Sequence, residues 1–529
     1  MALGCALVAG SALTEGPLGA RPSAAAYLPG ERVLTDDPLY RDLERLAATY
    51  GVTPRFLSMR PLRRAEALAF LDELAGTSVG DGDLSPTDDP AYIRARRALD
   101  PAAPGGVAPL IAARGEEGEA VEISPYASFL YSDDPRNRPD INRDYRLGGV
   151  FAAEFDSSVT VVADLYAGTA SQGGRGTPNF GTFNALVEGV DFNTWVNEAY
   201  VEARLGPLRA LAGHTWLRWG PGREGTLALS DAAPALDMVR AEVTALRSWR
   251  VQWFVSLLDP GVETYLAGHR VEWSRGGSFT AGFTELARFD GTSQAPLYLM
   301  PLVPYSFWEK RPKSSPASAI PGDTSGVALA KNNVLWAADL AWSFRPGWRV
   351  WGEFLLDDIS FSRDYKPDMI GYQAGVEWRR AVRGGRDALG LAVEFSRVNN
   401  FTYSAFHGHH FAHEGYPLGF VLGPDVASLG GEIAYEMGAA WEFRVRGEWR
   451  KKGEGAVGAA WEQADGEVLA DSYAGTTERE LRGGIALSYA PNRAVRAEVG
   501  VNTSDYEGYQ HGTEEKTAGG FYARGRLSW

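Results

Sequence analysis

The sequence predicts an all-β transmembrane barrel of about eighteen antiparallel strands, preceded by a small N-terminal α-helical segment in the periplasm. Three observations predict this fold. The last strand has an apolar face and a charged face, the same period of two continues through most of the chain, and short connections alternate with long ones. Together these features are typical of a sheet that closes on itself in a bilayer.

The last strand of the sequence is the most informative. Its residues divide between two faces, with Phe521, Ala523, Leu527 and Trp529 on one and Tyr522, Arg524, Arg526 and Ser528 on the other. Because side chains of a strand alternate, the apolar face would meet lipid and the charged face would line the interior. Backbone groups in lipid find hydrogen-bond partners only in the neighbouring strands of a closed barrel.

A period of two begins after Val121 and continues to the end of the chain. In one segment Trp441, Phe443, Val445 and Trp449 face one way, and Glu442, Arg444, Arg446, Glu448 and Arg450 face the other. A core strand of a soluble sandwich rarely carries so many charges on its second face. We expect strands to start near Val121, Arg146, Ser158, Thr194, Leu208, Leu236, Trp249, His269, Ser278, Asn333, Trp348, Gly371, Leu389, Gly430, Trp441, Leu481, Arg493 and Gly519.

The connections between these strands fall into two classes. Short periplasmic turns that alternate with long extracellular loops are typical of outer-membrane barrels, and a soluble β fold has no reason to keep this alternation. The short turns are Asp156-Ser157, Gly206-Pro207, Ser248, Gly276-Gly277, Arg345-Pro346-Gly347, Gly384-Gly385, Gly438-Ala439 and Pro491-Asn492. The long loops follow Tyr131, Thr169, Trp216, Leu258, Phe289, Asp357, Asn399, Arg450 and Val501.

The composition is compatible with a membrane barrel and disfavours a nucleic-acid surface. No apolar run reaches the roughly 18 residues of a helical span, but strands that alternate apolar and polar residues give only a weak hydropathy signal. Aromatic residues make up 12% of the chain, which is enough for two interfacial girdles. The net charge of -15 disfavours binding to nucleic acid, because phosphates require clustered cations.

The region before the barrel is predicted to hold two parts. Residues 1–26 resemble a signal peptide with a small-residue cleavage site, and its Cys5, the one cysteine of the chain, would be removed with it. The alternative, a lipoprotein signal around Cys5, is less favoured. Residues 27–118 are predicted to form a helical periplasmic segment and linker, and residues 119–529 the barrel. One helix ends at Gly51, a second begins at Pro61, and Asp88-Asp89-Pro90 starts a third.

Several motifs occur in a fixed order over most of the chain: Tyr40-Arg-Asp-Leu-Glu-Arg-Leu46, Arg60-Pro-Leu-Arg-Arg64, Asn197-Glu-Ala-Tyr-Val201, Trp219-Gly-Pro-Gly-Arg-Glu-Gly-Thr-Leu-Ala-Leu-Ser230, Glu353-Phe-Leu-Leu-Asp-Asp358, Glu394-Phe-Ser-Arg-Val-Asn-Asn-Phe-Thr-Tyr403 and Tyr416-Pro-Leu-Gly-Phe-Val-Leu-Gly-Pro-Asp425. These motifs resemble those of the capsule assembly Wzi family. The resemblance implies an outer-membrane barrel of a Gram-negative bacterium that acts as a lectin and holds capsular polysaccharide at the cell surface.

The third long loop carries the strongest candidates for a binding site. Its tryptophans offer faces on which sugar rings stack, and arginine pairs bidentately with the carboxylates of acidic sugars. If this loop converges with those after the ninth and thirteenth strands, the polysaccharide-binding residues are Trp216, Arg218, Trp219, Arg223, Tyr305, Trp308, Tyr403 and His413. The alternative for each residue is a structural one, in which the tryptophans anchor the barrel in the interface and the glycines shape a turn.

Metal and enzyme chemistry are weaker hypotheses. The spacing of His407-Gly-His-His-Phe-Ala-His413, with Glu414, suits Zn²⁺ or Cu²⁺, but such a loop more often uses histidine for hydrogen bonds, so we predict no metal and no cofactor. The sequence has no Gly-x-Ser-x-Gly, no His-Glu-x-x-His, no phosphate loop and no Cys-His pair, so we expect no enzymatic activity.

The sequence favours a lectin-like protein that binds capsular or other surface polysaccharide and helps to attach or assemble the capsule. The alternative is a porin or transport channel, because a barrel of this size is wide enough for an aqueous lumen. The long loop between Phe289 and Asn332 and the interleaved Glu and Arg lining favour closure. We expect contact with outer-membrane lipid, insertion by the barrel-assembly machinery through the C-terminal strand, a monomer, and no nucleic-acid partner.

Overall fold

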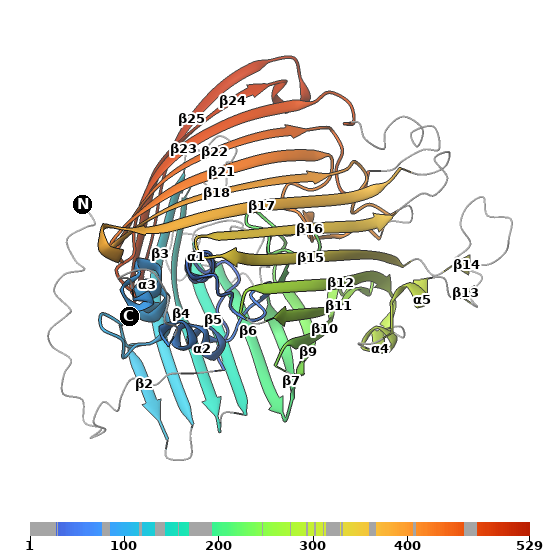
Figure 1. Cartoon of the computed structure of the whole chain (residues 1–529). Helices are drawn as coiled ribbons and strands as arrows, with labels where there is room; N and C mark the ends of the chain where they lie inside the picture. The colour runs from blue at the N-terminus through green and yellow to red at the C-terminus, as the bar shows by residue number, and fades with distance from the viewer. Residues whose placement is uncertain are drawn as a thin grey trace, which may run out of the picture.

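Most of the chain forms one closed barrel (Figure 1). The structure, a computed structural model, describes residue 28 and residues 30–76, 85–115, 119–132, 143–156, 158–168, 193–245, 247–275, 277–292, 295–300, 303–309, 312–313, 328–329, 332–358, 367–405, 409–459 and 473–529. Within these ranges, eighteen antiparallel strands close the barrel and three α-helices precede it. The predicted fold class is confirmed. The predicted signal peptide, residues 1–26, lies outside the described residues.

Each barrel strand pairs with the next one along the chain, and the last strand pairs with the first. The predicted starts lie close to the observed ones. The largest difference is at β11, which begins at Thr264 rather than near His269, because Thr264 and Tyr265 still pair with Asp290 and Phe289 of β12. The strands are β3 (Ala120–Ser132), β4 (Arg143–Phe155), β5 (Val159–Gly168), β6 (Asn193–Leu205), β7 (Leu208–Thr215), β9 (Leu236–Ala245), β10 (Trp249–Asp259), β11 (Thr264–Arg275), β12 (Phe279–Asp290), β15 (Asn333–Arg345), β16 (Trp348–Asp358), β17 (Met369–Val382), β18 (Asp387–Val398), β21 (Val426–Met437), β22 (Trp441–Lys452), β23 (Glu478–Tyr489), β24 (Val495–Glu507) and β25 (Glu515–Ser528).

Short elements lie between the barrel strands. β2 (Ile111–Arg114) pairs with residues 120–123 of β3, beyond the part of β3 that pairs with β25. The others are β8 (Arg218–Trp219), α4 (Ala295–Tyr298), α5 (Ser306–Glu309), β13 (Pro312–Lys313), β14 (Ala328–Leu329), β19 (Ala412–His413), β20 (Tyr416–Pro417) and the 3₁₀ turns Pro86–Asp88, Arg383–Gly385 and Tyr509–His511.

The two faces of the wall have the chemistry that the alternation predicts. On the outer face of the last strand, Phe521 and Leu527 are 43% and 49% exposed, and Trp529, which follows the strand, is 48% exposed. On its inner face Arg524 contacts Glu498 of β24 at 3.1 Å. An apolar outer surface around a closed, fully paired sheet is the arrangement that a bilayer requires.

Aromatic pairs gather on the wall next to the short turns. Trp and Tyr prefer the membrane–water interface, where the ring meets apolar chains and its polar atom meets water, so these pairs mark the level of one interface. Their ring centroids lie 6.0 Å apart for Trp249 and Trp273, 4.5 Å for Trp441 and Tyr489, and 5.7 Å for Trp342 and Phe344.

The helical segment, residues 30–100, packs its helices around its own apolar core. The third helix begins where the sequence predicts. Asp89 accepts a hydrogen bond from the Ala91 N–H at 2.8 Å, and Pro90 lies in the first turn. None of the helices in the described ranges is long and apolar enough to span a bilayer. The elements are α1 (Leu39–Tyr50), β1 (Met59–Arg60), α2 (Arg64–Ala75) and α3 (Pro90–Leu99).

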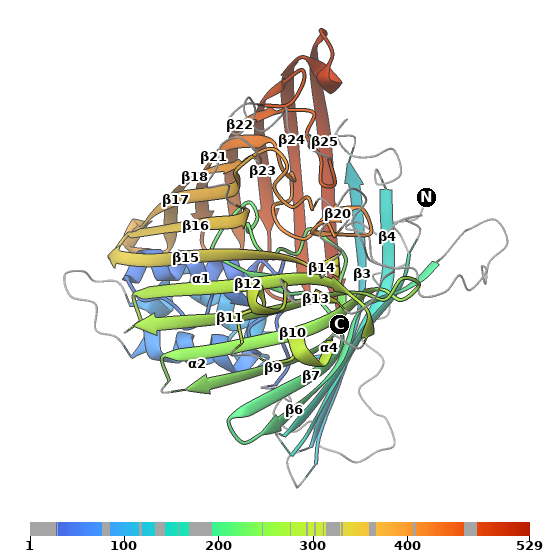
Figure 2. The same cartoon turned by 90° about the vertical axis from the view of Figure 1, so that its right-hand side faces the viewer.

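The helical segment closes the short-turn end of the barrel (Figures 1 and 2). The Gly347 N–H, in the turn after β15, donates to the Ala48 carbonyl of α1 at 2.7 Å, and Arg97 of α3 donates to the Pro491 carbonyl in another turn at 3.1 Å. Arg379 of β17 contacts Asp89 at 2.8 Å. The segment is therefore joined both to the rim and to the lumen side of the wall.

Candidate functional site

The inner loop, residues 216–235, connects β7 to β9 by folding back into the lumen. Glu353 of β16 accepts hydrogen bonds from the N–H groups of Gly222 at 2.7 Å and Leu227 at 2.8 Å. A side chain at Gly222 would not fit, because a Cβ there would lie 2.1 Å from the Gly225 carbonyl oxygen. A wall carboxylate and a glycine-rich turn thus hold the loop inside the barrel.

Arg223 fixes the inner loop to the opposite part of the wall. Its backbone N–H donates to Glu394 of β18 at 2.7 Å, and its guanidinium contacts Glu432 at 2.6 Å and Glu377 at 3.4 Å. Its side chain is only 11% exposed. The geometry makes Arg223 a strut between loop and wall, and a role in polysaccharide binding remains a prediction that this burial does not favour.

Arg218 and Trp219 join the inner loop to the helical segment. They form the two-residue strand β8, which pairs with β1 in the register Met59 to Trp219 and Arg60 to Arg218. The Arg218 guanidinium also contacts Asp231 within the loop at 3.4 Å. Two segments that enter the lumen from opposite ends therefore share backbone hydrogen bonds at its centre.

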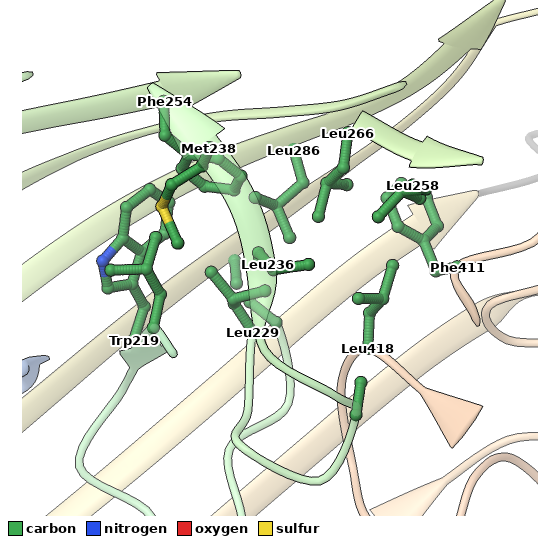
Figure 3. Packing of buried hydrophobic residues seen from close by; sticks show 14 of the residues in the cluster. Trp219, Leu229, Leu236, Met238, Phe254, Leu258, Leu266, Leu286, Phe411 and Leu418 are labelled. Atoms are coloured by element: carbon green, nitrogen blue, oxygen red, sulfur yellow. The ribbon is translucent and has the colours of Figure 1, made fainter. Parts of the chain in front are cut away.

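Trp219 is a core residue of the filled lumen (Figure 3). It is 1% exposed, its Nε1–H donates to Gln252 at 2.7 Å, and its ring meets Phe254 edge-on at a centroid distance of 5.3 Å. Trp216 is only partly buried, and its Nε1–H donates to the Ala233 carbonyl at 3.2 Å. Of the two tryptophans, only Trp216 has a ring that solvent reaches.

The histidine loop, residues 399–425, packs over the inner loop. Tyr403 is fully buried, and its hydroxyl donates to the Leu227 carbonyl at 2.6 Å and accepts from the Phe420 N–H at 3.1 Å. Phe411 and Leu418 extend the same apolar cluster toward β10 and β11 (Figure 3). Two of the three loops considered in the sequence analysis, those after β7 and β18, therefore meet inside the barrel.

The histidines of this loop are bonded within the protein. His413 is 8% exposed, and burial together with the Arg288 guanidinium lowers its pKa to about 4. His409 Nε2 lies 3.0 Å from Asp290, and His410 Nδ1 accepts from the Ala405 N–H at 3.0 Å. His407 is outside the described residues, and within the described ranges no cluster of His, Cys, Asp and Glu is suited to a metal ion.

Tyr305 lies in a separate cluster from Trp219 and Tyr403. It is fully buried, its ring centroid is 4.4 Å from that of His269 on β11, and its N–H donates to Glu285 of β12 at 2.8 Å. Tyr305 therefore packs on the wall, in a cluster of described residues that includes none from the inner loop. Trp308 belongs to α5, but its side chain is outside the described part of the structure.

The wall carboxylates are the residues of this site that the sequence did not single out. Glu353 and Glu394 both stand in motifs that the sequence analysis noted, but their role depends on which loop reaches them. The sequence does predict that both side chains point into the lumen, because the residues before and after each of them on the strand face lipid. This alternation predicts that each carboxylate lies inside the barrel, but it does not predict which backbone N–H groups donate to it.

Comparisons with known proteins show the fold. No protein-family model and no curated protein matches this sequence. Among solved structures, Wzi of Escherichia coli, described as an outer-membrane protein involved in group 1 capsule assembly and as a carbohydrate-binding β-barrel, matches with a TM-score of 0.62 and 16% identity over 94% of this chain and 99% of that chain. The chain has the fold of Wzi. It is an outer-membrane β-barrel of the Gram-negative type.

Two further structures superpose less well on this Wzi-like barrel. OprD of Pseudomonas aeruginosa matches with a TM-score of 0.43 and 9% identity over 79% of this chain and 97% of that chain. A loop-deletion mutant of OmpT of Vibrio cholerae matches with a TM-score of 0.36 and 11% identity over 78% and 99%.

Proposed function

We propose that this barrel is a lectin-like outer-membrane protein that binds capsular or other surface polysaccharide and helps to attach or assemble the capsule. The observation that carries the proposal is the filled lumen, in which β1 pairs with β8 and Tyr403 bonds to Leu227. A filled lumen favours binding at the long-loop end over bulk passage. The likeness to Wzi supports carbohydrate as the ligand class, because that protein is described as a carbohydrate-binding barrel with the same fold.

Exposed aromatic rings at the long-loop end are the groups that we assign to the polymer. Phe307 on α5 is 71% exposed, and Trp216 at the end of β7 is partly exposed. We keep Trp308, which follows Phe307, as a predicted contact. The buried residues Trp219 and Tyr403 then act by holding the loops in shape. Binding to each repeat would be weak, but a long polymer engages many copies at once, so avidity retains it.

The test measures where the polymer resides. Deleting the gene should leave polymer synthesis intact and increase the polymer shed into the medium. The double variant Trp216→Ala/Phe307→Ala should shed polymer at normal barrel abundance. Val262→Ala, which removes a 65% exposed apolar side chain from the short connection between β10 and β11, should behave as wild type. Unchanged cell association in the deletion strain would overturn the proposal.

The transport alternative is tested in planar bilayers. A lumen filled by the helical segment and the two loops should show no wide-pore conductance. Large, steady openings of the purified protein, comparable to those of an unplugged barrel of this size, would favour a channel and would remove polysaccharide binding as the primary function.

A further inference from the structure

The barrel interior differs between its two sides in how far solvent reaches the inward charges. Where the helical segment and inner loop fill the lumen, the side chains of Arg270, Glu272 and Arg379 are 0% exposed. On β22 and β25 the inward side chains of Arg446 and Arg524 are 46% and 58% exposed. We name the inward surface around Arg446 on β22, Arg524 and Arg526 on β25 and Arg146 on β4 the open sector.

Small side chains leave the open sector unfilled. The neighbours of Arg446 along one row of the wall are Gly484 on β23, Asn502 on β24 and Gly520 on β25. Two of these three positions project no side chain into the lumen. Arg446 contacts Glu224 of the inner loop at 2.8 Å, and the pair remains open to water.

Wall acids of the open sector lie beneath its arginines. Glu498 is 9% exposed and accepts from the Tyr522 hydroxyl at 3.0 Å and from Arg524 at 3.1 Å. Asp144 is 5% exposed and is held by Arg146 at 2.6 Å. Because a guanidinium has five N–H groups, one such contact leaves Arg524 with donors directed at the solvent.

Two arginines of the open sector are also fixed in orientation. The Arg526 guanidinium lies 3.8 Å from the ring centroid of Tyr126, and that of Arg146 lies 4.5 Å from Tyr166. Both arginines are paired in register with Ser128 of β3, one from each side. Stacking on a ring holds the planar fork and leaves its edge for another partner. Within the described ranges, Arg526 forms no ion pair with a carboxylate.

Space continues from Arg526 toward the short-turn end. A cavity of about 180 Å³ lies between the helical segment and the wall, and Arg526, Arg493 and Arg496 line it. Five acids line it as well, so the cavity itself carries both signs of charge: Glu31, Asp37, Glu122, Asp164 and Glu198. Of these, Glu122, Asp164 and Glu198 are at most 5% exposed. The attraction for an anion therefore rests on the arginines of β25: the side chain of Arg524 is 58% exposed against 10% for its partner Glu498, and Arg526 has no carboxylate partner within the described ranges.

We propose that the open sector binds carboxylate groups, with Arg524 and Arg526 as the principal donors and Arg146 and Arg446 beside them. A planar carboxylate matches the two parallel N–H groups of a guanidinium fork. The carboxylate belongs either to a small organic acid or to a uronic-acid residue of a saccharide, and the second source rests on the proposed function.

The experiment titrates the purified full chain in detergent by calorimetry, at low and high salt. The probes are galacturonate, trigalacturonate and maltotriose, which separate charge from sugar shape. Both acids should bind more weakly as salt rises, and maltotriose should not bind. Equal affinity for the two acids identifies the free acid as the occupant, and tighter binding of trigalacturonate identifies the saccharide.

Variants locate the binding. Arg524→Ala/Arg526→Ala should weaken trigalacturonate binding by about tenfold or more, because two charge-assisted donors are lost. The Lys double variant, which keeps the charge and loses the fork, should fall between. Arg383→Ala removes an arginine with a 76% exposed side chain in the turn after β17 and should have no effect. The proposal is overturned if neither acid binds, if maltotriose binds equally, or if both double variants bind as wild type.

The two proposals fail separately. If Trp216→Ala/Phe307→Ala loses capsule retention but binds the two acids with unchanged affinity, the result supports the proposed role of the loops and leaves the carboxylate site unaffected. Normal retention in a strain carrying Arg524→Ala/Arg526→Ala, with calorimetric binding abolished, leaves the carboxylate site standing and shows that the capsule does not use it.

Discussion

Arg379 of β17 joins two parts of the protein through one side chain. Its guanidinium contacts Asp89 of the helical segment and Glu436 of β21, each at 2.8 Å, and solvent does not reach it. Such a charge is stable in the lumen only because its partners and hydrogen bonds are complete. Removing one charge from such a buried cluster therefore lowers the free energy of unfolding by more than the intact cluster contributes to it, because the remaining charges are left unpaired.

Arg223 provides the test of this principle. Arg223→Ala should lower the free energy of unfolding by about 3 kcal/mol, because the buried Glu377 would lose its cation and Glu432 would keep only the more distant Arg446 and Arg45. The measurement is guanidinium-induced unfolding in detergent. Arg479→Ala is the control, because the side chains of Arg479 and its partner Glu507 are 54% and 67% exposed, so that water screens their pairing. Equal stability of the two variants would contradict a strut role for Arg223.

His413 predicts a pH response of the histidine loop. Its pKa in the protein, about 4, lies below the ordinary value of 6.5, so the folded loop binds fewer protons than the released loop between these two values. Stability should therefore be complete above about pH 6.5 and fall as the pH drops toward 4, by up to about 3 kcal/mol. Proteolysis within residues 399–425 at decreasing pH measures it. His413→Gln should lose most of this pH dependence.

At the scale of the element, the last strand shows most clearly the residue pattern that a bilayer requires. Leu527 is 49% exposed on the outer face and Ser528 lines the cavity, while Trp529, just beyond the strand, is 48% exposed and also borders that cavity. Neighbouring residues of one strand thus experience lipid and water. Substitutions with the same charge should have opposite outcomes on the two faces.

Leu527→Asp/Trp529→Asp should prevent insertion, because each outward charge costs up to a few kcal/mol, depending on its depth in the bilayer. Outer-membrane abundance and heat-modifiable mobility measure the result. Ser528→Asp, on the same strand but facing inward, should insert normally. A double variant present at wild-type abundance would contradict the lipid-facing assignment.

The strands were predictable because lipid imposes a regular pattern on the sequence. Trp441, Phe443 and Val445 alternate with Glu442 and Arg444, and no tertiary knowledge is needed to place the two sets on opposite faces. The ends of strands such as β11 were less predictable, because residues beyond the bilayer continue to pair without needing an apolar outer face.

At the scale of the whole molecule, three segments fill one side of the lumen and leave the open sector on the other. The helical segment enters from the short-turn end, and the inner and histidine loops enter from the long-loop end. A variant lacking residues 30–100 should therefore show a larger conductance in planar bilayers than the full chain, because water would replace the helices. A folded but non-conducting deletion variant would show that the two loops seal the lumen without the helical segment.

The candidate site was harder to predict than the fold. Aromatic and arginine residues in the inner loop suggested a sugar surface, but Trp219 and Arg223 face the wall because Gln252, Glu394 and Glu432 accept their hydrogen bonds. Composition identifies residues that can bind a sugar and equally residues that can fill a lumen. Only the path of the loop decides between these roles.

The helical segment is, in effect, a tethered ligand of its own barrel. Its ion pairs with the wall, such as Arg379 with Asp89, are contacts that a separate protein could make, but the chain that leads into β2 and β3 keeps the two partners at a high local concentration. A single protease cut between α3 and β2 would turn this intramolecular equilibrium into a bimolecular one. The same contacts would then compete with dilution, and occupancy of the lumen would depend on how much of the segment was present in the periplasm.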